Sequence, residues 1–212
     1  MSAAAATAYV IHLEGTANRL PLIEALQKGT GLPLTVFFAS DGLATWPIAP
    51  SFRHPWKFSR LTQGMIGCAE SHLAVLEKAE TAKEPFFLFE DDTELVVPFQ
   101  EVTDFVNSIK GRWDIILLGA NEYVESTAAP TSVKVGRFWG THAMLINPAC
   151  CSTIMDVFSE EIIDGIFLPA DWMYNEAIRK RGLKVYGPAE PGRFFKQKSG
   201  LVSLITGNVR LD

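Results

Sequence analysis

The sequence predicts an α/β domain whose central mixed, mostly parallel sheet is flanked by helices. Short apolar runs of strand length alternate with helical patterns through the first half of the chain, and strands then follow one another. The 212 residues are 48% hydrophobic, which is enough for one domain with a large core. The 14 Phe and 5 Trp exclude a disordered chain, because so many large apolar groups cannot stay solvated.

The first half is predicted to alternate strands and helices. Expected strands cover residues 9–13, 34–39, 86–89 and 115–118, which are rich in β-branched, aromatic and aliphatic side chains. Expected helices cover residues 19–28, 64–83 and 99–109, ended by Gly29, Pro85 and Gly111. Residues 44–60 contain three prolines and show no period, so we expect a loop there.

The second half is predicted to pair strands before two further helices. Residues 122–131 are polar and predict a loop, and residues 133–135 and 138–147 predict a strand pair turning at Gly136. Pro148 opens a helix to about residue 158. Residues 171–181 predict a helix and residues 183–186 a strand.

The charge distribution bears on the kind of ligand. The formal charge is −5, which argues against a surface devoted to nucleic acid. Residues 178–212 nevertheless carry a net +6, so the other residues carry −11. A basic segment on an acidic body suits an anionic ligand such as a nucleotide diphosphate, or an anionic membrane surface. A solvated helix face followed by a basic tail is the alternative.

Cysteine usage and hydropathy bear on location. Three cysteines, two of them adjacent, form no disulfide framework, which favours a reducing compartment and hence the cytoplasm. The first residues lack the basic and apolar regions of a signal peptide. No apolar run approaches the ~20 residues of a membrane helix, so we expect at most peripheral membrane contact.

An acidic triplet, Glu90-Asp91-Asp92, follows the apolar run at residues 86–89. Ligands of open α/β sheets bind beyond the carboxyl ends of the strands, and carboxylates there are suitable ligands for Mg²⁺ or Mn²⁺. Alternation along an extended chain would point Glu90 and Asp92 the same way and Asp91 the opposite way. A solvated acidic turn is the alternative.

The segment at residues 64–72 (GMIGCAESH) places two glycines at a helix start, where a backbone or an anion can approach closely. Cys68 and His72 are four residues apart on one helix face and could share a metal. No second Cys/His pair has useful spacing, so a zinc site is not expected. Ser71 and His72 diverge on a helix and cannot form a nucleophile–base pair.

Together these segments resemble glycosyltransferase family 25, the group of lipooligosaccharide and procollagen galactosyltransferases. The matching segments, in chain order, are residues 10–13 (VIHL) with Arg19, 64–72, 87–92 (FLFEDD), 114–118 (DIILL), 140–146 (GTHAMLI), 169–171 (PAD) and 195–197 (FKQ). Their order and spacing are more specific than any one of them. Met65 and His12 depart from the Glu and Asn usual in the family, at positions expected near the donor nucleotide.

The resemblance implies a GT-A fold with one domain over residues 1–212. Its nucleotide-donor half would cover about residues 1–120 and its acceptor half about 121–212. The chain ends without an obvious capping element, which leaves open that it is one domain of a longer protein. The implied reaction is an inverting transfer from a nucleotide sugar, a UDP-hexose, to a glycan, glycolipid or glycoprotein.

The resemblance and the residues together assign the site. Glu90 and Asp92 would bind Mn²⁺ or Mg²⁺, which would stabilise the leaving diphosphate. Asp171 would take the proton of the acceptor hydroxyl, because it precedes a helix in an apolar segment where burial raises basicity; a helix N-cap is its alternative role. The expected donor-binding residues are His12, Leu13, Arg19, Ser71, His72, Asp91 and Gln197.

Further residues are expected near the substrates. Basic side chains at 193, 196 and 198 would close over the diphosphate or face an anionic acceptor, and Trp46, Trp56 and Trp139 could stack on a sugar. His142 is a weaker candidate on the acceptor side.

Three other functions fit parts of the sequence. A haloacid-dehalogenase-type phosphohydrolase would need Thr or Val where the chain has Glu94. A glycosidase needs two carboxyl groups about 5–9 Å apart on either side of a sugar, which contiguous acids cannot provide. A non-catalytic nucleotide-sugar-binding module remains open.

Overall fold

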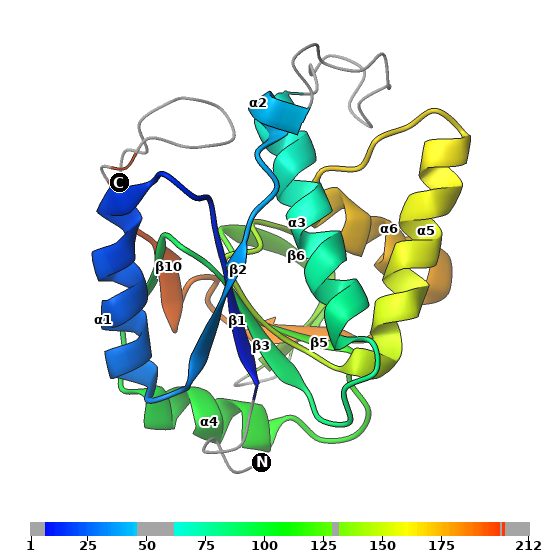
Figure 1. The fold of residues 1–212 in the computed structure, drawn as a ribbon. Coiled ribbons are helices and arrows are strands. Elements are labelled where there is room, and N and C mark those ends of the chain that lie inside the picture. The colour runs from blue at the N-terminus through cyan, green and yellow to red at the C-terminus, as the bar shows by residue number, and fades with distance from the viewer. Residues whose placement is uncertain (1–6, 46–61, 129–131, 200, 202–212) are drawn as a thin grey trace.

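The fold is built on an eight-stranded sheet with the strand order β2-β1-β3-β8-β5-β9-β7-β6 (Figure 1). The computed structural model describes residues 7–45, 62–128, 132–199 and 201. The strands of this sheet are β1 (Ala8–His12), β2 (Leu34–Phe38), β3 (Phe86–Glu90), β5 (Ile115–Gly119), β6 (Glu122–Ala128), β7 (Ser132–Trp139), β8 (Ala143–Ile146) and β9 (Val185–Pro188). Two short strands, β4 (Thr93–Leu95) and β10 (Phe195–Gln197), pair separately.

The strand directions confirm the predicted mixed, mostly parallel sheet. Strand β1 pairs in parallel with β2 and β3, and β5 pairs in parallel with β9. Strand β8 runs antiparallel between β3 and β5, and β7 runs antiparallel between β9 and β6. Six strands therefore point one way, and the carboxyl ends of β1 and β3 meet at one edge.

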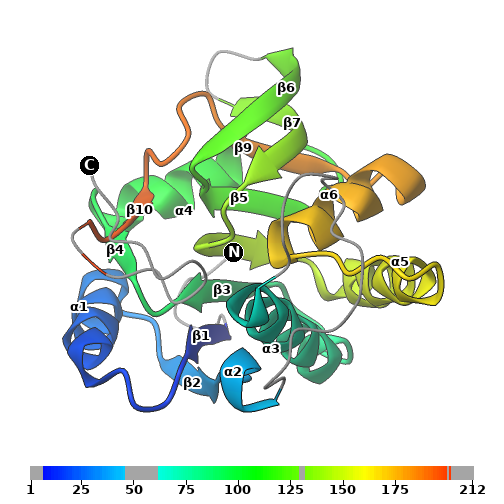
Figure 2. The same cartoon turned by 90° about the horizontal axis from the view of Figure 1, so that it is seen from above.

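Helices cover both faces of the sheet (Figure 2). They are α1 (Leu20–Thr30), α2 (Gly42–Thr45), α3 (Gln63–Ala79), α4 (Phe99–Ser108), α5 (Cys151–Ile163) and α6 (Ala170–Arg181), with 3-10 turns at Ala17–Arg19 and Pro148–Cys150. One core lies under α3, α5 and α6, and the other lies under α1 and α4. Strand β3 feeds both cores, because Phe86 and Leu88 face the first while Phe87 and Phe89 face the second. Burial on both faces explains its continuous apolar run.

Helices α1, α3, α4, α5 and α6 and the buried strands lie where the sequence predicts them, with different ends. The short helix α2 was not predicted, and it includes the first two residues of the loop expected at 44–60. Helix α1 runs past Gly29 and ends at Gly31, whose φ of +68° is the left-handed conformation that glycine adopts readily. Helix α3 ends at Ala79, earlier than the predicted residue 83. The short strands β4 and β10 were not predicted.

The predicted loop at residues 122–131 and the predicted turn at Gly136 are wrong, whereas residues 133–135 and 138–139 are strand as predicted. The predicted polar loop is the strand β6, which pairs with β7, and β7 runs through Gly136 without a turn. Strand β6 forms the edge of the sheet, where the exposed Glu122, Val124 and Glu125 obscure the strand pattern. The chain turns instead at Gly140, whose φ is +85°, before it enters β8.

The start of α3 packs backbone to backbone against the segment that follows β2. A Cβ atom at Gly67 would lie 2.5 Å from the Ser40 carbonyl oxygen and 2.7 Å from the Gly42 nitrogen. The Ser71 hydroxyl donates to the Gly67 carbonyl oxygen at 2.6 Å and accepts from the Ser40 amide at 2.9 Å. This contact fixes α3 beside the carboxyl end of β1.

We therefore predict that Gly67→Ala destabilises the protein by about 1–3 kcal/mol, because the new methyl group overpacks rigid backbone. In an unobstructed helix the same change would stabilise by about 1 kcal/mol. Gly29→Ala in α1 is the matched control, since its Cβ would meet only the flexible Leu95 side chain, at 3.2 Å. Urea unfolding measures both variants. Equal stability of the two variants would contradict the close contact.

Candidate active site

A cavity of about 170 Å³ lies at the carboxyl ends of β1 and β3, beside α2 and the start of α3. This is where an open α/β sheet binds its ligands. Seven of the predicted site residues line it: Leu13, Arg19, Ser71, His72, Glu90, Asp91 and Asp92. His12 and Gln197 contact its acids from the side, and Asp171 is not among its lining residues.

A buried arginine neutralises two of the three acids. Arg19 is 3% exposed, and its Nη1 lies 2.8 Å from Asp91 Oδ1 and 2.9 Å from Asp92 Oδ2. His12, at the end of β1, places Nδ1 at 2.8 Å from Asp91 Oδ2. Asp91 therefore joins the ends of β1 and β3 through two side chains.

The alternation predicted for the triplet is wrong. The chain leaves the extended conformation after Glu90, and Asp91 and Asp92 lie in a turn. Both aspartates consequently reach Arg19, whereas Glu90 is held by other residues. Asp92 is also only 2% exposed, so the alternative of a solvated acidic turn is wrong for this residue.

Glu90 is held from the opposite side of the cavity. Thr141 Oγ1, in the loop before β8, donates to Glu90 Oε1 at 2.6 Å, and Gln197 Nε2 donates to Oε2 at 3.5 Å. Burial by itself raises the pKa of Glu90, but His72, Thr141 and His142 outweigh it and lower the pKa to about 2. Glu90 is therefore a carboxylate at neutral pH.

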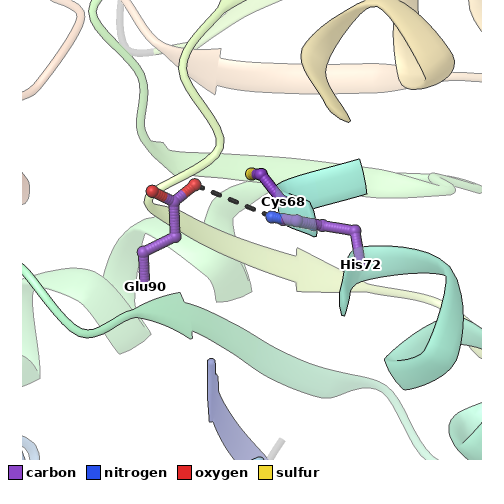
Figure 3. Close-up of side chains that lie close together, drawn as sticks. All are labelled: Cys68, His72 and Glu90. Atoms are coloured by element: carbon purple, nitrogen blue, oxygen red, sulfur yellow. Dashed lines mark ion pairs between the residues drawn. The ribbon is translucent and has the colours of Figure 1, made fainter. Parts of the chain in front are cut away.

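His72 lies between Glu90 and Cys68. Its Nδ1 lies 3.0 Å from the hydroxyl of Tyr174 on α6, and its Nε2 lies 3.7 Å from Glu90 Oε1, longer than a hydrogen bond. Cys68, one turn earlier on α3, places its sulfur in the same cluster (Figure 3). The sequence showed the Cys68–His72 pair, but the third member comes from a different element.

Asp171 lies in the first turn of α6, next to the loop that holds Glu90. Its carboxylate accepts from the amides of Trp172 and Gly140, and Gly140 directly precedes Thr141. Burial raises the pKa of Asp171, and the nearby charge of Glu90 raises it further. Pro169 occupies the N-cap position of α6, so the alternative role of Asp171 as N-cap is wrong.

Several predicted contacts lie elsewhere. Lys198 pairs with Glu94 at 3.0 Å and Arg193 lies 4.0 Å from Glu101, so neither cation faces the cavity. His142 Nε2 lies 3.3 Å from the carbonyl oxygen of Phe195. Trp46, Trp56 and most of the chain after residue 199 lie outside the described residues.

An aromatic pair lies next to Asp171. The Arg137 guanidinium is 4.3 Å from the ring centroid of Trp172 and 4.9 Å from that of Trp139. This cluster places two Trp rings beside the start of α6.

The site also contains residues that the sequence analysis missed. Thr141 and Tyr174 contact Glu90 and His72 from segments 51 and 102 residues away along the chain. No periodicity or local motif relates residues at such separations, so only the resemblance to a family pointed to the loop that contains Thr141.

The fold is α/β, and it has a cavity at the carboxyl edge of the sheet next to clustered acids. The model of glycosyltransferase family 25 (LPS biosynthesis protein) matches residues 5–162, and the chain belongs to this family. It is a glycosyltransferase. No curated protein sequence matches the chain.

Two solved structures are among the structural matches, both at low sequence identity. The CTP:phosphocholine cytidylyltransferase of Streptococcus pneumoniae is 13% identical with a TM-score of 0.49, over 91% of this chain and 93% of that chain. A Drosophila β-1,4-galactosyltransferase 7 mutant, solved with manganese, UDP-Gal and xylobiose, is 11% identical with a TM-score of 0.47, over 90% and 69%. Among the described residues, no helix combines the length and apolarity needed to span a bilayer.

We predict that Arg19→Met lowers the free energy of unfolding by about 3–5 kcal/mol, because it leaves two buried carboxylates without their cation. The matched control is Arg179→Met, which removes an exposed pair with Glu176 and should change stability by less than about 1 kcal/mol. Urea unfolding compares the two. Adding Asp91→Asn to Arg19→Met should restore part of the loss. A loss no larger than that of the control would contradict the account.

Proposed function

We propose that this glycosyltransferase moves a hexose from a UDP-sugar to a hydroxyl group of a glycan, glycolipid or glycoprotein, with inversion and with the help of a divalent cation. The observation that carries the proposal is the convergence of Glu90, Asp91 and Asp92 on one cavity at the carboxyl edge of the sheet. The three cysteines form no disulfide with one another, which keeps the cytoplasm as the predicted compartment.

The residues suit a hard divalent cation. Glu90 and Asp92 line the same cavity and offer carboxylate oxygens, the ligands that Mg²⁺ and Mn²⁺ prefer. Arg19 already holds one oxygen of Asp92, so a cation would share this carboxylate with the guanidinium. A cation bound there would stabilise the negative charge that develops on the leaving diphosphate.

The donor would enter through the cavity between β1 and α3. Leu13 and Ile11 give it an apolar wall, and Arg19 gives it a fixed positive charge next to the acids. Ser71 also lines it, but its hydroxyl proton is committed to the Gly67 carbonyl oxygen. We therefore propose that Ser71 positions the segment at Ser40, and that the other residues lining the cavity contact the donor.

Asp171 is the proposed catalytic base. The loop at Gly140 and Thr141 hydrogen-bonds both Asp171 and Glu90, which supports a role for Asp171 next to the proposed cation site. The raised pKa of Asp171 makes its carboxylate a stronger proton acceptor for the acceptor hydroxyl group. Trp139 and Trp172, beside it, offer aromatic surface to an acceptor sugar.

We predict that Asp171→Asn lowers kcat by ~10²–10⁴-fold and leaves the affinity for UDP unchanged, because the amide keeps the shape but accepts no proton. A panel of UDP-sugars with glycan acceptors and Mn²⁺ provides the activity assay. The control is Asp156→Asn on the exposed face of α5, which should transfer at the wild-type rate. Near wild-type turnover by Asp171→Asn would exclude it as the base. Phosphate release without sugar transfer would favour the phosphohydrolase, and donor binding without turnover a binding module.

We predict that Asp92→Asn abolishes Mn²⁺-dependent UDP binding, whereas Asp91→Asn retains it. Both changes remove one carboxylate from Arg19, so both should lower stability to a similar extent. Of these two aspartates, Asp92 is the proposed cation ligand, because Asp91 is fully engaged by Arg19 and His12. Calorimetric titration of UDP with and without Mn²⁺ measures the difference. Normal Mn²⁺-dependent binding by Asp92→Asn would overturn this assignment.

A further inference from the structure

We infer that Cys68, His72 and Glu90 form a second metal site, selective for a thiolate-binding ion of the Zn²⁺ class. This inference does not rest on the proposed transfer reaction. It concerns ion binding by three side chains, only one of which, Glu90, belongs to the proposed Mg²⁺ or Mn²⁺ site.

The spacing of the three ligand atoms suits one ion. The Cys68 sulfur, a His72 ring nitrogen and a Glu90 oxygen all lie within 4.8 Å of one another. Ligands of a tetrahedral zinc ion, with bonds of about 2.0–2.3 Å, are separated by roughly 3.5 Å. His72 Nε2 and Glu90 Oε1 already have this separation, at 3.7 Å. Cys68 is only partly buried, and its sulfur lies within 4.8 Å of the other two ligand atoms.

The His72 ring supplies an independent indication. Its side chain is completely buried, yet Nε2 makes no hydrogen bond. Its ion-pair partner, Glu90 Oε1 at 3.7 Å, is too distant for a hydrogen bond, and leaving a buried polar nitrogen without one is costly. Nε2 is directed toward Glu90, on the side where the Cys68 sulfur lies (Figure 3).

Tyr174 orients the His72 ring, as a hydrogen-bond partner of a metal-bound histidine does. Its hydroxyl lies 3.0 Å from His72 Nδ1 and can either donate or accept. When Nδ1–H donates to the Tyr174 oxygen, the lone pair of Nε2 faces the cluster. Zinc-bound histidines are oriented in this way by a hydrogen bond from the other ring nitrogen. Thr141 plays the corresponding part for Glu90, to which it donates at 2.6 Å.

The donor set decides which ion is preferred. A thiolate and an imidazole favour Zn²⁺ or Co²⁺ over Mg²⁺, which prefers oxygen ligands. All three residues line the cavity, so the fourth position of the ion would be open to it. Three protein ligands with an open position are typical of reactive rather than purely structural zinc sites.

Cobalt absorption tests the inference directly. Co²⁺ titrated into the wild-type protein should give one thiolate-to-cobalt charge-transfer band with intense tetrahedral visible bands, and Zn²⁺ should displace it. Cys68→Ser should lose the charge-transfer band. Tyr174→Phe should keep it with an affinity ~10–100-fold lower. Cys151→Ser is the matched control, because that buried core thiol is not one of the three proposed ligands and its loss should keep the charge-transfer band.

Two results would overturn the inference. One is a wild-type spectrum without a sulfur-to-cobalt charge-transfer band. This result does not depend on whether any variant folds. The other is an unchanged spectrum in Cys68→Ser. Sugar transfer with Mn²⁺ is measured separately. A protein that transfers sugar but binds no Co²⁺ through sulfur excludes this site alone, and one that binds Co²⁺ but transfers no sugar excludes the proposed function alone.

Discussion

The contact of Arg19 with Asp91 and Asp92 is the interaction on which the site depends. Three consecutive carboxylates at the end of a buried strand repel one another and lose hydration, so the fold must neutralise them. Arg19, almost completely buried, does so for two of them at 2.8 and 2.9 Å. His12 adds a further partner to Asp91. The ends of β1 and β3 are thereby joined by charge as well as by their strand hydrogen bonds.

This arrangement divides the acidic triplet into separate roles. Asp91 uses both oxygens to hold the strand ends together, while Glu90 turns toward the loop before β8 and toward α3. The antiparallel insertion of β8 beside β3 brings that loop, and with it the start of α6, to the carboxyl edge of the sheet. Asp171 is placed near Glu90 by this insertion, although the two residues are 81 positions apart along the chain.

The sequence was informative wherever one local pattern determined the outcome. Strands β3 and β5 are buried on both faces and therefore read as continuous apolar runs, and α3 shows its period clearly. The prediction failed for edge strand β6 because exposed Glu122, Val124 and Glu125 mix polar and apolar side chains on its outer positions. Strands β4 and β10 are too short to show a period. The order of short motifs predicted the family, which the family model confirms over residues 5–162.

The geometry within the site could be predicted only in part. Seven of the ten predicted site residues line one cavity, because strand ends and a helix start meet at the same edge of a sheet. The pairing of carboxylates was not predictable, since alternation fails once the chain turns after Glu90. The third member of the Cys68–His72 cluster also depends on tertiary contact, which spacing along the chain does not show.

The central claim is that the cavity between β1, β3 and α3 binds the nucleotide of the donor. Hydrogen exchange of the amides, measured with and without saturating UDP and Mn²⁺, tests it most directly. The account predicts slower exchange in residues 12–19, 39–43, 64–72 and 90–93, with no change in the β6–β7 hairpin. Slower exchange confined to that hairpin, with unchanged exchange around the cavity, would contradict it.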